Sequence, residues 1–318
     1  MVVEHDQNGI KPVTYEILQT ANRLAGCVIA YYFSNSVEID AQQLFDSGAD
    51  DVRFCIHPDF YQYTHENYAS GLLSEIQKSQ PDILLLSSSN NGKELSAELA
   101  TRLNVGLATD CIDLQITNEG EVLVNRPIFS GKALLSCELK GKKPYLITLR
   151  PNVFRDEAFK ATRKGIIKKE EITLPAVSKM VGNLTREVGG DLDITEARII
   201  VSGGLGMQDP KNFKILEDLA EVLGAAVAAS RPVVDNGWQE YTRQVGQTGR
   251  TVSPDLYIAC GISGAVQHLA GMTSSRCIVA INSDPYAPIF SIADYGIVGD
   301  VLKIVPILTQ EFKNFLSH

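Results

Sequence analysis

The sequence predicts an α/β protein with two doubly wound domains, the first carrying an antiparallel β extension and the second built on a parallel, ligand-binding sheet. Three observations lead to this fold class. Short apolar runs typical of buried strands alternate with amphipathic stretches in both halves of the chain. Strand-like runs without intervening helices lie between these halves. The chain has 318 residues, enough for two domains of roughly 100–200 residues. We expect these domains at 1–190 and 191–318.

The first half alternates strands and helices. Pro12 suits the first helical position, where the N–H that proline lacks would be unpaired anyway. Ser36 can cap the second helix, and Pro81 ends the third. The apolar run 82–86 is typical of a strand in the middle of a parallel sheet. The expected strands are at 2–3, 27–33, 51–56 and 82–86, and the expected helices are at 12–24, 36–45, 64–79 and 92–103.

The pattern changes near residue 109. Turn residues here separate strand-like runs that leave no room for a helix, so we expect an antiparallel extension of the first domain. These runs are 111–117, 121–125, 133–139 and 145–150. The stretch 151–193 is basic and weakly patterned, and we interpret it as a linker between the domains with a solvated cationic face.

The stretch 244–268 is the centre of the second half. Gly261 ends an apolar strand, and Ser263-Gly264 are predicted to cap a helix that carries His268. The unpaired N–H groups and the dipole of such a helix favour an anion, for example a phosphate. Loops that follow the parallel strands meet at one sheet edge, where open α/β folds bind ligands. The expected strands are at 196–201, 225–230, 255–260, 277–282 and 295–298, with helices at 209–224, at 264–270 and from 301.

The composition narrows the class of protein. The formal net charge of −9 disfavours nucleic-acid binding. No apolar run is long enough to span a bilayer, and no signal- or transit-peptide pattern opens the sequence. The six cysteines form no Cys-x-x-Cys pair, so we expect reduced thiols in a cytoplasmic protein and no metal site. The glycine-rich stretches match neither standard nucleotide fingerprint, and no nucleophile has an evident base, which disfavours a hydrolase.

Two charged or titratable side chains are candidates for ligand contact. Arg231 follows the strand that ends at Ser230 and should lie above the ligand edge, although a surface ion pair with Asp235 is an equally good interpretation. His268 lies one helical turn beyond Gly264 and can face the same ligand, although a lone histidine is more often structural.

Four further polar residues lie in the expected loops. Gln247 and Thr248 lie between two glycines and offer an amide and a hydroxyl, which are also ordinary turn residues. Asn282 closes a strand and Asp300 precedes a helix, so both can serve as caps.

The chain resembles the alpha subunit of electron transfer flavoproteins over about 197–310. The resemblance rests on the ordered segments SGG (202–204), AASRPVVD (228–235), QVGQTGRTVSPDLYIACGISGAVQHLAGM (244–272), AINSDPYAPIF (280–290) and ADYGIVGD (293–300). The first domain is similar more loosely, through VVEH (2–5) and PDILLLSSS (81–89). The resemblance implies a non-covalent FAD bound mainly by the second domain. It also implies a heterodimer with an electron transfer flavoprotein beta subunit.

The resemblance assigns roles to several residues. Ser230 and Arg231 match a pair at the cofactor, with Arg231 beside the isoalloxazine. Thr248 matches a hydroxyl near flavin N5, and His268 matches an imidazole at flavin O2. Arg231 and a protonated or hydrogen-bonding His268 would stabilise charge on the reduced ring and so tune the flavin. The implied cofactor-binding residues are Leu205, Ser230, Arg231, Gln244, Val245, Gly246, Gln247, Thr248, Ser263, Gly264, Ala265, Val266, Gln267, His268, Asn282, Asp300 and Val301.

One position departs from the family pattern. Leu205 stands where the family commonly has the arginine of Gly-Gly-Arg-Gly. The loss of this cation predicts weaker FAD binding or a lower reduction potential, unless Arg243 or Arg250 compensates.

Three functions fit the sequence. The first is an electron carrier, rather than a classical enzyme, that accepts electrons from flavin dehydrogenases such as acyl-CoA dehydrogenases. The second is the alpha subunit of an electron-bifurcating flavoprotein whose partner chain oxidises NADH. The third is a regulatory module that binds a nucleotide without redox chemistry, and the combination of Arg231, Thr248 and His268 argues against it.

Overall fold

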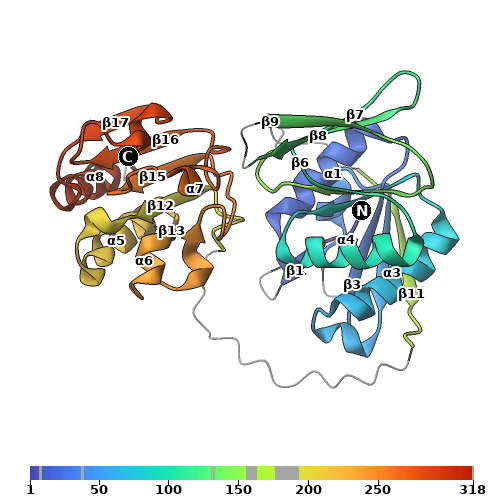
Figure 1. The fold of residues 1–318 in the computed structure, drawn as a ribbon. Helices are drawn as coiled ribbons and strands as arrows, with labels where there is room; N and C mark the ends of the chain where they lie inside the picture. The colour runs from blue at the N-terminus through green and yellow to red at the C-terminus, as the bar shows by residue number, and fades with distance from the viewer. Residues whose placement is uncertain are drawn as a thin grey trace. The chain divides into compact units, whose positions relative to one another are not determined.

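A computed structural model describes residues 1–6, 9–36, 39–129, 131, 133–154, 163–175 and 193–316. These residues form two compact units (Figure 1), one within 1–128 and 134–186 and the other within 187–318 together with 129–133. The predicted boundary at 190/191 and part of the predicted linker lie outside the described residues. None of the described helices is both long and apolar enough to cross a membrane.

The first unit is built on a parallel sheet with strands β3 (Ile29–Ser34), β4 (Asp51–Ile56), β5 (Ile83–Ser87), β6 (Leu107–Cys111), β10 (Tyr145–Leu149) and β11 (Ile166–Glu171). Its two halves are ordered β11-β4-β3 and β5-β10-β6. Residues 1–3 join these halves. The Tyr31 N–H donates to the Met1 carbonyl and the Val3 N–H donates to the Tyr31 carbonyl, each at 2.9 Å. On the other side, the Val2 N–H donates to the Leu85 carbonyl at 3.2 Å.

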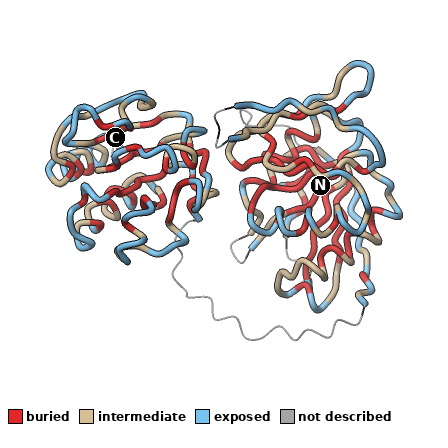
Figure 2. The backbone as a smooth tube through the Cα atoms, in the orientation of Figure 1, coloured by how far each residue is buried: buried red, intermediate tan, exposed pale blue. Residues whose placement is uncertain are grey.

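Helices cover both faces of this sheet (Figure 1). They are α1 (Pro12–Leu24), α2 (Gln42–Asp46), α3 (His65–Ser79) and α4 (Asn90–Leu103), with a 3₁₀ turn η1 (Pro58–Tyr61). Helices α1 and α2 bury Ile17 and Phe45 in the cluster on one face. Helices α3 and α4 bury Leu72 and Leu99 in the cluster on the other. Figure 2 shows the buried residues following the strands between these layers. The doubly wound prediction for this unit is confirmed.

The antiparallel extension has a different membership from the one predicted. It consists of β7 (Asp113–Ile116), β8 (Val122–Ile128) and β9 (Ala133–Leu139), and β7 pairs with β8 in antiparallel fashion. The fourth predicted member, β10, instead pairs in parallel with β5 and β6 in the main sheet. A separate two-stranded hairpin is formed by β1 (His5–Asp6) and β2 (Gly9–Ile10).

Two further predictions for the first unit are wrong, namely the start of the second helix and the extent of the linker. Helix α2 has Ala41 as its N-cap, so the predicted cap at Ser36 is wrong. The Ser36 N–H instead donates to Ser34 Oγ at 3.2 Å. The linker prediction is wrong for 166–171, because β11 there pairs in parallel with β4 along six residues. The Lys168 ammonium of this strand lies 3.2 Å from the Asp51 carboxylate. This lysine therefore forms an ion pair with the neighbouring strand β4.

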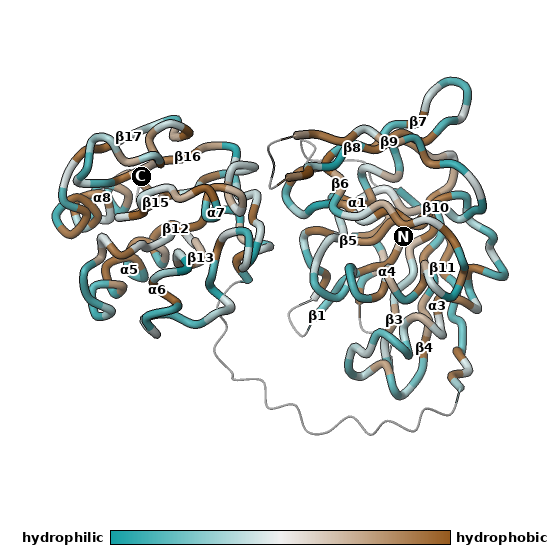
Figure 3. Tube along the Cα trace, in the orientation of Figure 1, coloured by the Kyte–Doolittle hydropathy of each residue, from teal (hydrophilic) through white to brown (hydrophobic). Residues whose placement is uncertain are grey.

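The second unit contains a six-stranded sheet formed by β12 (Ile199–Gly203), β13 (Ala226–Ser230), β14 (Gln244–Val245), β15 (Leu256–Cys260), β16 (Ile278–Asn282) and β17 (Tyr295–Val298). The order is β14-β13-β12-β15-β16-β17, and every pair is parallel. Figure 3 shows apolar residues concentrated along the central strands. The predicted parallel sheet is confirmed.

Different elements cover the two faces of this sheet. The long helices α5 (Phe213–Leu223) and α8 (Val301–Leu316), with the short α6 (Arg231–Asp235), bury Leu216, Val233 and Val305 on one face. The opposite face carries Tyr257 and Ile289 in a second cluster, covered by α7 (Val266–Leu269) and the 3₁₀ turn η5 (Pro288–Ser291). The remaining 3₁₀ turns are η2 (Leu205–Met207), η3 (Pro210–Asn212) and η4 (Tyr241–Arg243).

Candidate functional site at the carboxyl edge of the second sheet

The strand order of the second sheet reverses between β12 and β15, which is the position where open α/β sheets bind ligands. The loops after these two strands meet there. The Gly204 N–H donates to the Cys260 carbonyl at 2.9 Å, and the Gly206 N–H donates to the Gly261 carbonyl at 3.0 Å. A Cβ on Gly204 would lie 2.2 Å from the Gly261 carbonyl oxygen. Only glycine therefore permits this approach of the two backbones.

The loop 244–249 is fastened to the turn that follows β15. The Gln247 N–H donates to the Gln267 carbonyl at 2.7 Å. Gly246 has φ +142°, and a Cβ there would lie 2.8 Å from the same carbonyl oxygen. Segments 204–206, 244–249 and 261–268 thus form one continuous rim, which we call the ligand edge. The structure brings together here most of the residues predicted for the cofactor.

The turn of the ligand edge presents backbone donors. In the described part of the chain, the N–H groups of Gly264, Ala265, Val266 and Gln267 donate to no main-chain acceptor. The predicted cap is wrong, because Ala265 rather than Ser263 is the N-cap of α7. This helix has four residues, so its dipole is small. The expected preference for an anion rests on the N–H groups themselves.

His268 is buried beneath the ligand edge. The residue is 6% exposed, and its Nε2 lies 3.0 Å from the Tyr257 hydroxyl oxygen. Burial lowers the pKa of His268 to about 4, against a smaller opposing effect of the Val245 main chain. Burial therefore favours the neutral imidazole over the protonated form. Its Nδ1 is buried and has no hydrogen-bond partner among the described residues.

Arg231 lies at the surface at the start of α6. Its Nε is 3.2 Å from the Asp235 carboxylate, and its side chain is 60% exposed. This contact is the surface ion pair that the sequence offered as an alternative. Ser230, which precedes it, is buried at the end of β13. An exposed pair of this kind contributes little to stability, so Arg231 can change partner at low cost.

The hydroxyl of Thr248 belongs to the loop of the ligand edge. Thr248 is exposed, whereas Gln244 is buried. The Gln244 side-chain amide donates to Thr248 Oγ1 at 3.1 Å. The Tyr241 hydroxyl donates to the Thr248 carbonyl at 2.6 Å. These bonds fix the loop conformation while the threonine side chain remains open to solvent.

The remaining predicted residues shape the neighbouring loops. The Asn282 side-chain amide donates to the Ile262 carbonyl at 2.9 Å, which anchors the loop after β15. Asp300 accepts from the Leu302 N–H at 3.0 Å and caps α8, and Val301 is buried. Asn282 Oδ1 also accepts from the Asp284 N–H at 3.0 Å, so Asn282 caps the turn after β16. The capping interpretation of Asp300 is confirmed as well.

Leu205 occupies an open position on the ligand edge. It is 47% exposed on the 3₁₀ turn after β12. Of the two arginines expected to compensate for it, Arg243 donates to the Gln239 side chain at 2.6 Å.

Two residues of this site were missed at the sequence level. Tyr257 and Ser202 are fully buried in β15 and β12. They lie on the same face of adjacent strands, because Tyr257 pairs with Ile200 and Ala259 pairs with Ser202. Polar residues inside otherwise apolar strands are the signal that could have identified them, since buried hydroxyls need partners.

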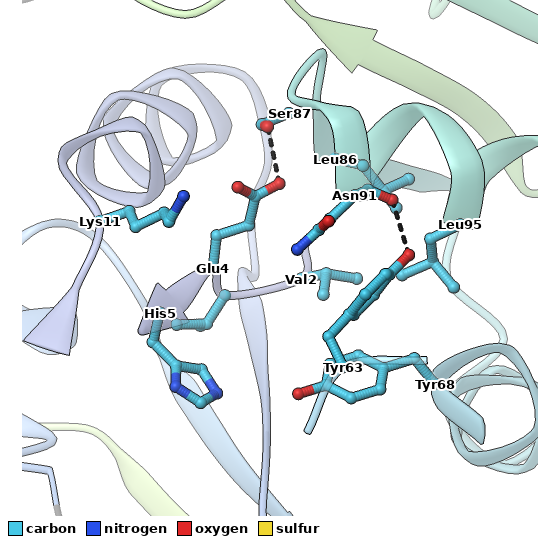
Figure 4. Close-up of a pocket in the computed structure, with 12 residues that line it drawn as sticks. Val2, Glu4, His5, Lys11, Tyr63, Tyr68, Leu86, Ser87, Asn91 and Leu95 are labelled. Carbon is cyan, nitrogen blue, oxygen red and sulfur yellow. Dashed lines mark hydrogen bonds between the residues drawn. The ribbon is translucent and has the colours of Figure 1, made fainter. Parts of the chain in front are cut away.

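A separate pocket lies in the first unit, between the amino-terminal residues and the start of α4 (Figure 4). Its volume is about 40 Å³, which is space for water rather than for a nucleotide. Glu4 Oε1 accepts hydrogen bonds from the Ser87 and Ser89 hydroxyls at 2.7 and 2.6 Å. The carboxylate of Glu4 therefore already fills the anion position near this helix start.

Comparisons with known proteins cover nearly the whole chain. The family model described as "Electron transfer flavoprotein FAD-binding domain" matches residues 193–273, and the one described as "Electron transfer flavoprotein domain" matches residues 1–175. The electron transfer flavoprotein subunit alpha of Bacillus subtilis is 42% identical, over 97% of this chain and 95% of its own length. That of Thermoanaerobacterium thermosaccharolyticum is 40% identical, over 98% and 97%. Protein FixB of Azotobacter vinelandii is 37% identical, over 99% and 91%.

Proposed function

Because the chain belongs to the electron transfer flavoprotein alpha-subunit family, we propose that its second unit binds one FAD at the ligand edge. We propose further that the chain carries electrons from flavin dehydrogenases, such as acyl-CoA dehydrogenases, to a downstream acceptor. It does so as a heterodimer with the family's beta subunit. Its six thiols are free, which supports a reducing compartment such as the cytoplasm.

The observation that carries this proposal is the set of unused donors at the ligand edge. Four consecutive N–H groups, from Gly264 to Gln267, lack main-chain acceptors in the described part of the chain. The buried Nδ1 of His268 lacks a partner as well. Gly264 and His268 are buried, and buried donors are normally satisfied. A ligand with phosphate oxygens and ring acceptors would satisfy both sets, and FAD is such a ligand.

The residues present fit FAD in distinct ways. The N–H groups of the turn would hold the pyrophosphate, because consecutive backbone donors bind anions. His268 would offer the flavin ring a neutral hydrogen bond, and Thr248 would offer a hydroxyl from the loop. Arg231 would exchange its exposed contact with Asp235 for the ring or a phosphate. When bound, FAD supplies one- and two-electron redox chemistry, and the protein supplies binding, orientation and electrostatics.

A proline substitution tests the role of the turn. Val266 is the first residue of α7 and is exposed, a position that tolerates proline because its N–H is not used within the helix. Val266→Pro should leave the fold intact and remove one donor. A hydrogen bond to a charged group contributes about 1.5–3 kcal/mol, so the FAD dissociation constant should rise at least about tenfold.

The matched control is Val266→Ala, which shortens the side chain and keeps the N–H. Both variants are co-expressed with the beta subunit, depleted of flavin and titrated with FAD by fluorescence. Equal affinities of the two variants would place the pyrophosphate away from this turn. A wild-type heterodimer that remains colourless after incubation with FAD would reject the function as a whole.

A further inference from the structure

A buried tyrosine of β15 contacts the histidine of the ligand edge. Tyr257 has no exposed surface, and its hydroxyl oxygen lies 3.0 Å from His268 Nε2. The two ring centroids are 6.2 Å apart with the planes inclined by 60°, so the rings meet edge to face. This is the one hydrogen bond to the imidazole with good geometry among the described residues.

The surroundings fix the direction of this bond. His268 Nε2 is the hydrogen-bond partner of the buried Tyr257 hydroxyl among the described residues, whereas Ser202 Oγ has none. If Nε2 carried the proton and donated, the buried phenolic O–H would have no acceptor among the described residues, which is unfavourable. The Tyr257 hydroxyl therefore donates to an unprotonated His268 Nε2.

We propose that Tyr257 is a positioning residue that holds His268 as the neutral tautomer with its proton on Nδ1. Nε2 then serves as the acceptor of the Tyr257 hydroxyl, and the Nδ1–H remains available as a donor at the ligand edge. The inference that this donor serves FAD rests on the proposed function, whereas the tautomer does not. The role of Tyr257 is comparable to that of the second partner that fixes a metal-bound or catalytic histidine.

The tautomer can be measured without flavin. The heterodimer is labelled with ¹⁵N-histidine, and His268 is identified among the five histidines of this chain by comparison with His268→Gln. In the wild type, Nδ1 of His268 should resonate as a protonated nitrogen and Nε2 as an unprotonated one. The reverse assignment would overturn the proposal.

Two tyrosine variants separate positioning from packing. Tyr257→Phe keeps the ring and removes the hydroxyl, so the His268 resonances should move toward those of a mixture of tautomers. Tyr295→Phe is the matched control, because Tyr295 is 67% exposed in β17, and it should leave the His268 resonances unchanged. His268 signals in Tyr257→Phe that match the wild type would reject the positioning role.

The flavin-loaded protein gives a second readout. Tyr257→Phe should shift the midpoint potential of bound FAD relative to wild type, and Tyr295→Phe should not. If the tautomer is as proposed but no FAD binds, the proposed function fails and the local assignment stands. If FAD binds with an unshifted potential in Tyr257→Phe, the link between Tyr257 and the cofactor fails.

Discussion

Replacing Gly246 tests how the ligand edge is assembled. This residue has φ +142°, and an added Cβ would lie 2.8 Å from the Gln267 carbonyl oxygen. The backbone conformation alone costs a residue with a side chain about 1–3 kcal/mol. If the loop moves to relieve the contact, the 2.7 Å hydrogen bond from Gln247 to Gln267 is lost as well, at about 1 kcal/mol. Gly246→Ala should therefore separate the loop from the turn.

We expect this separation to weaken FAD binding about 10- to 100-fold, since each 1.4 kcal/mol changes the affinity tenfold. Fluorescence titration of the flavin-depleted heterodimer measures the affinity, and circular dichroism checks the fold. The matched control is Gly224→Ala at the end of α5, where φ is +61° and no atom lies within 4 Å of the added Cβ. It places an alanine at positive φ away from the site and should bind FAD normally. A folded Gly246→Ala protein with wild-type affinity would refute the reasoning.

Three further predictions concern charge. Leu205→Arg adds a cation at an exposed position and should tighten FAD binding about fivefold relative to Leu205→Gln, because an exposed pair contributes about 1 kcal/mol; equal affinities would show that this position does not contact FAD. Glu75 is fully buried and lies 3.2 Å from Arg53, so Glu75→Ala should destabilise the first unit by about 3–5 kcal/mol in chemical denaturation. The exposed partner gives the control, since Lys78→Ala should cost about 1 kcal/mol or less, and similar losses would contradict the buried-pair argument. Burial lowers the pKa of His268 from its ordinary 6.5 to about 4 in the folded protein, so the unfolded chain binds more protons between these pH values. Stability should thus fall by up to about 3 kcal/mol as pH decreases from 6.5 to 4, and His268→Gln should show a smaller decrease than wild type.

Much of the fold was predictable because the strands of both units are apolar and bounded by clear breakers. Pro12 begins α1 and Gly224 ends α5 as their residue types require. Strand β11 was missed because its sequence, Ile-Ile-Lys-Lys-Glu-Glu, resembles a charged linker. It is held at the sheet edge by backbone hydrogen bonds to β4. Such bonds do not require an apolar or alternating pattern of side chains, so the sequence does not indicate them. The place of β10 in the main sheet was missed for a related reason, because sheet order depends on distant partners.

The candidate site was predictable where glycines and polar loops follow strands. Glycines follow two of the strands at Gly204 and Gly246, where the structure contains close approaches of two backbones. The length of α7 was not predictable, since 264–270 has the composition of a longer helix, and four residues suffice in the packed turn. The contact between Tyr257 and His268 was also hidden, because it joins a strand interior to a turn 11 residues later.

The position of β11 at the edge of the first sheet bears on any attempt to isolate the first unit. A fragment that stops after β10 would lack the strand that pairs with β4 over six residues. The uncovered edge would present a row of unpaired amides and carbonyls, which is a template for association between molecules. A soluble excised fragment therefore has to extend through Glu171, the last residue of β11. This end lies far along the sequence from β4, the strand whose edge β11 covers.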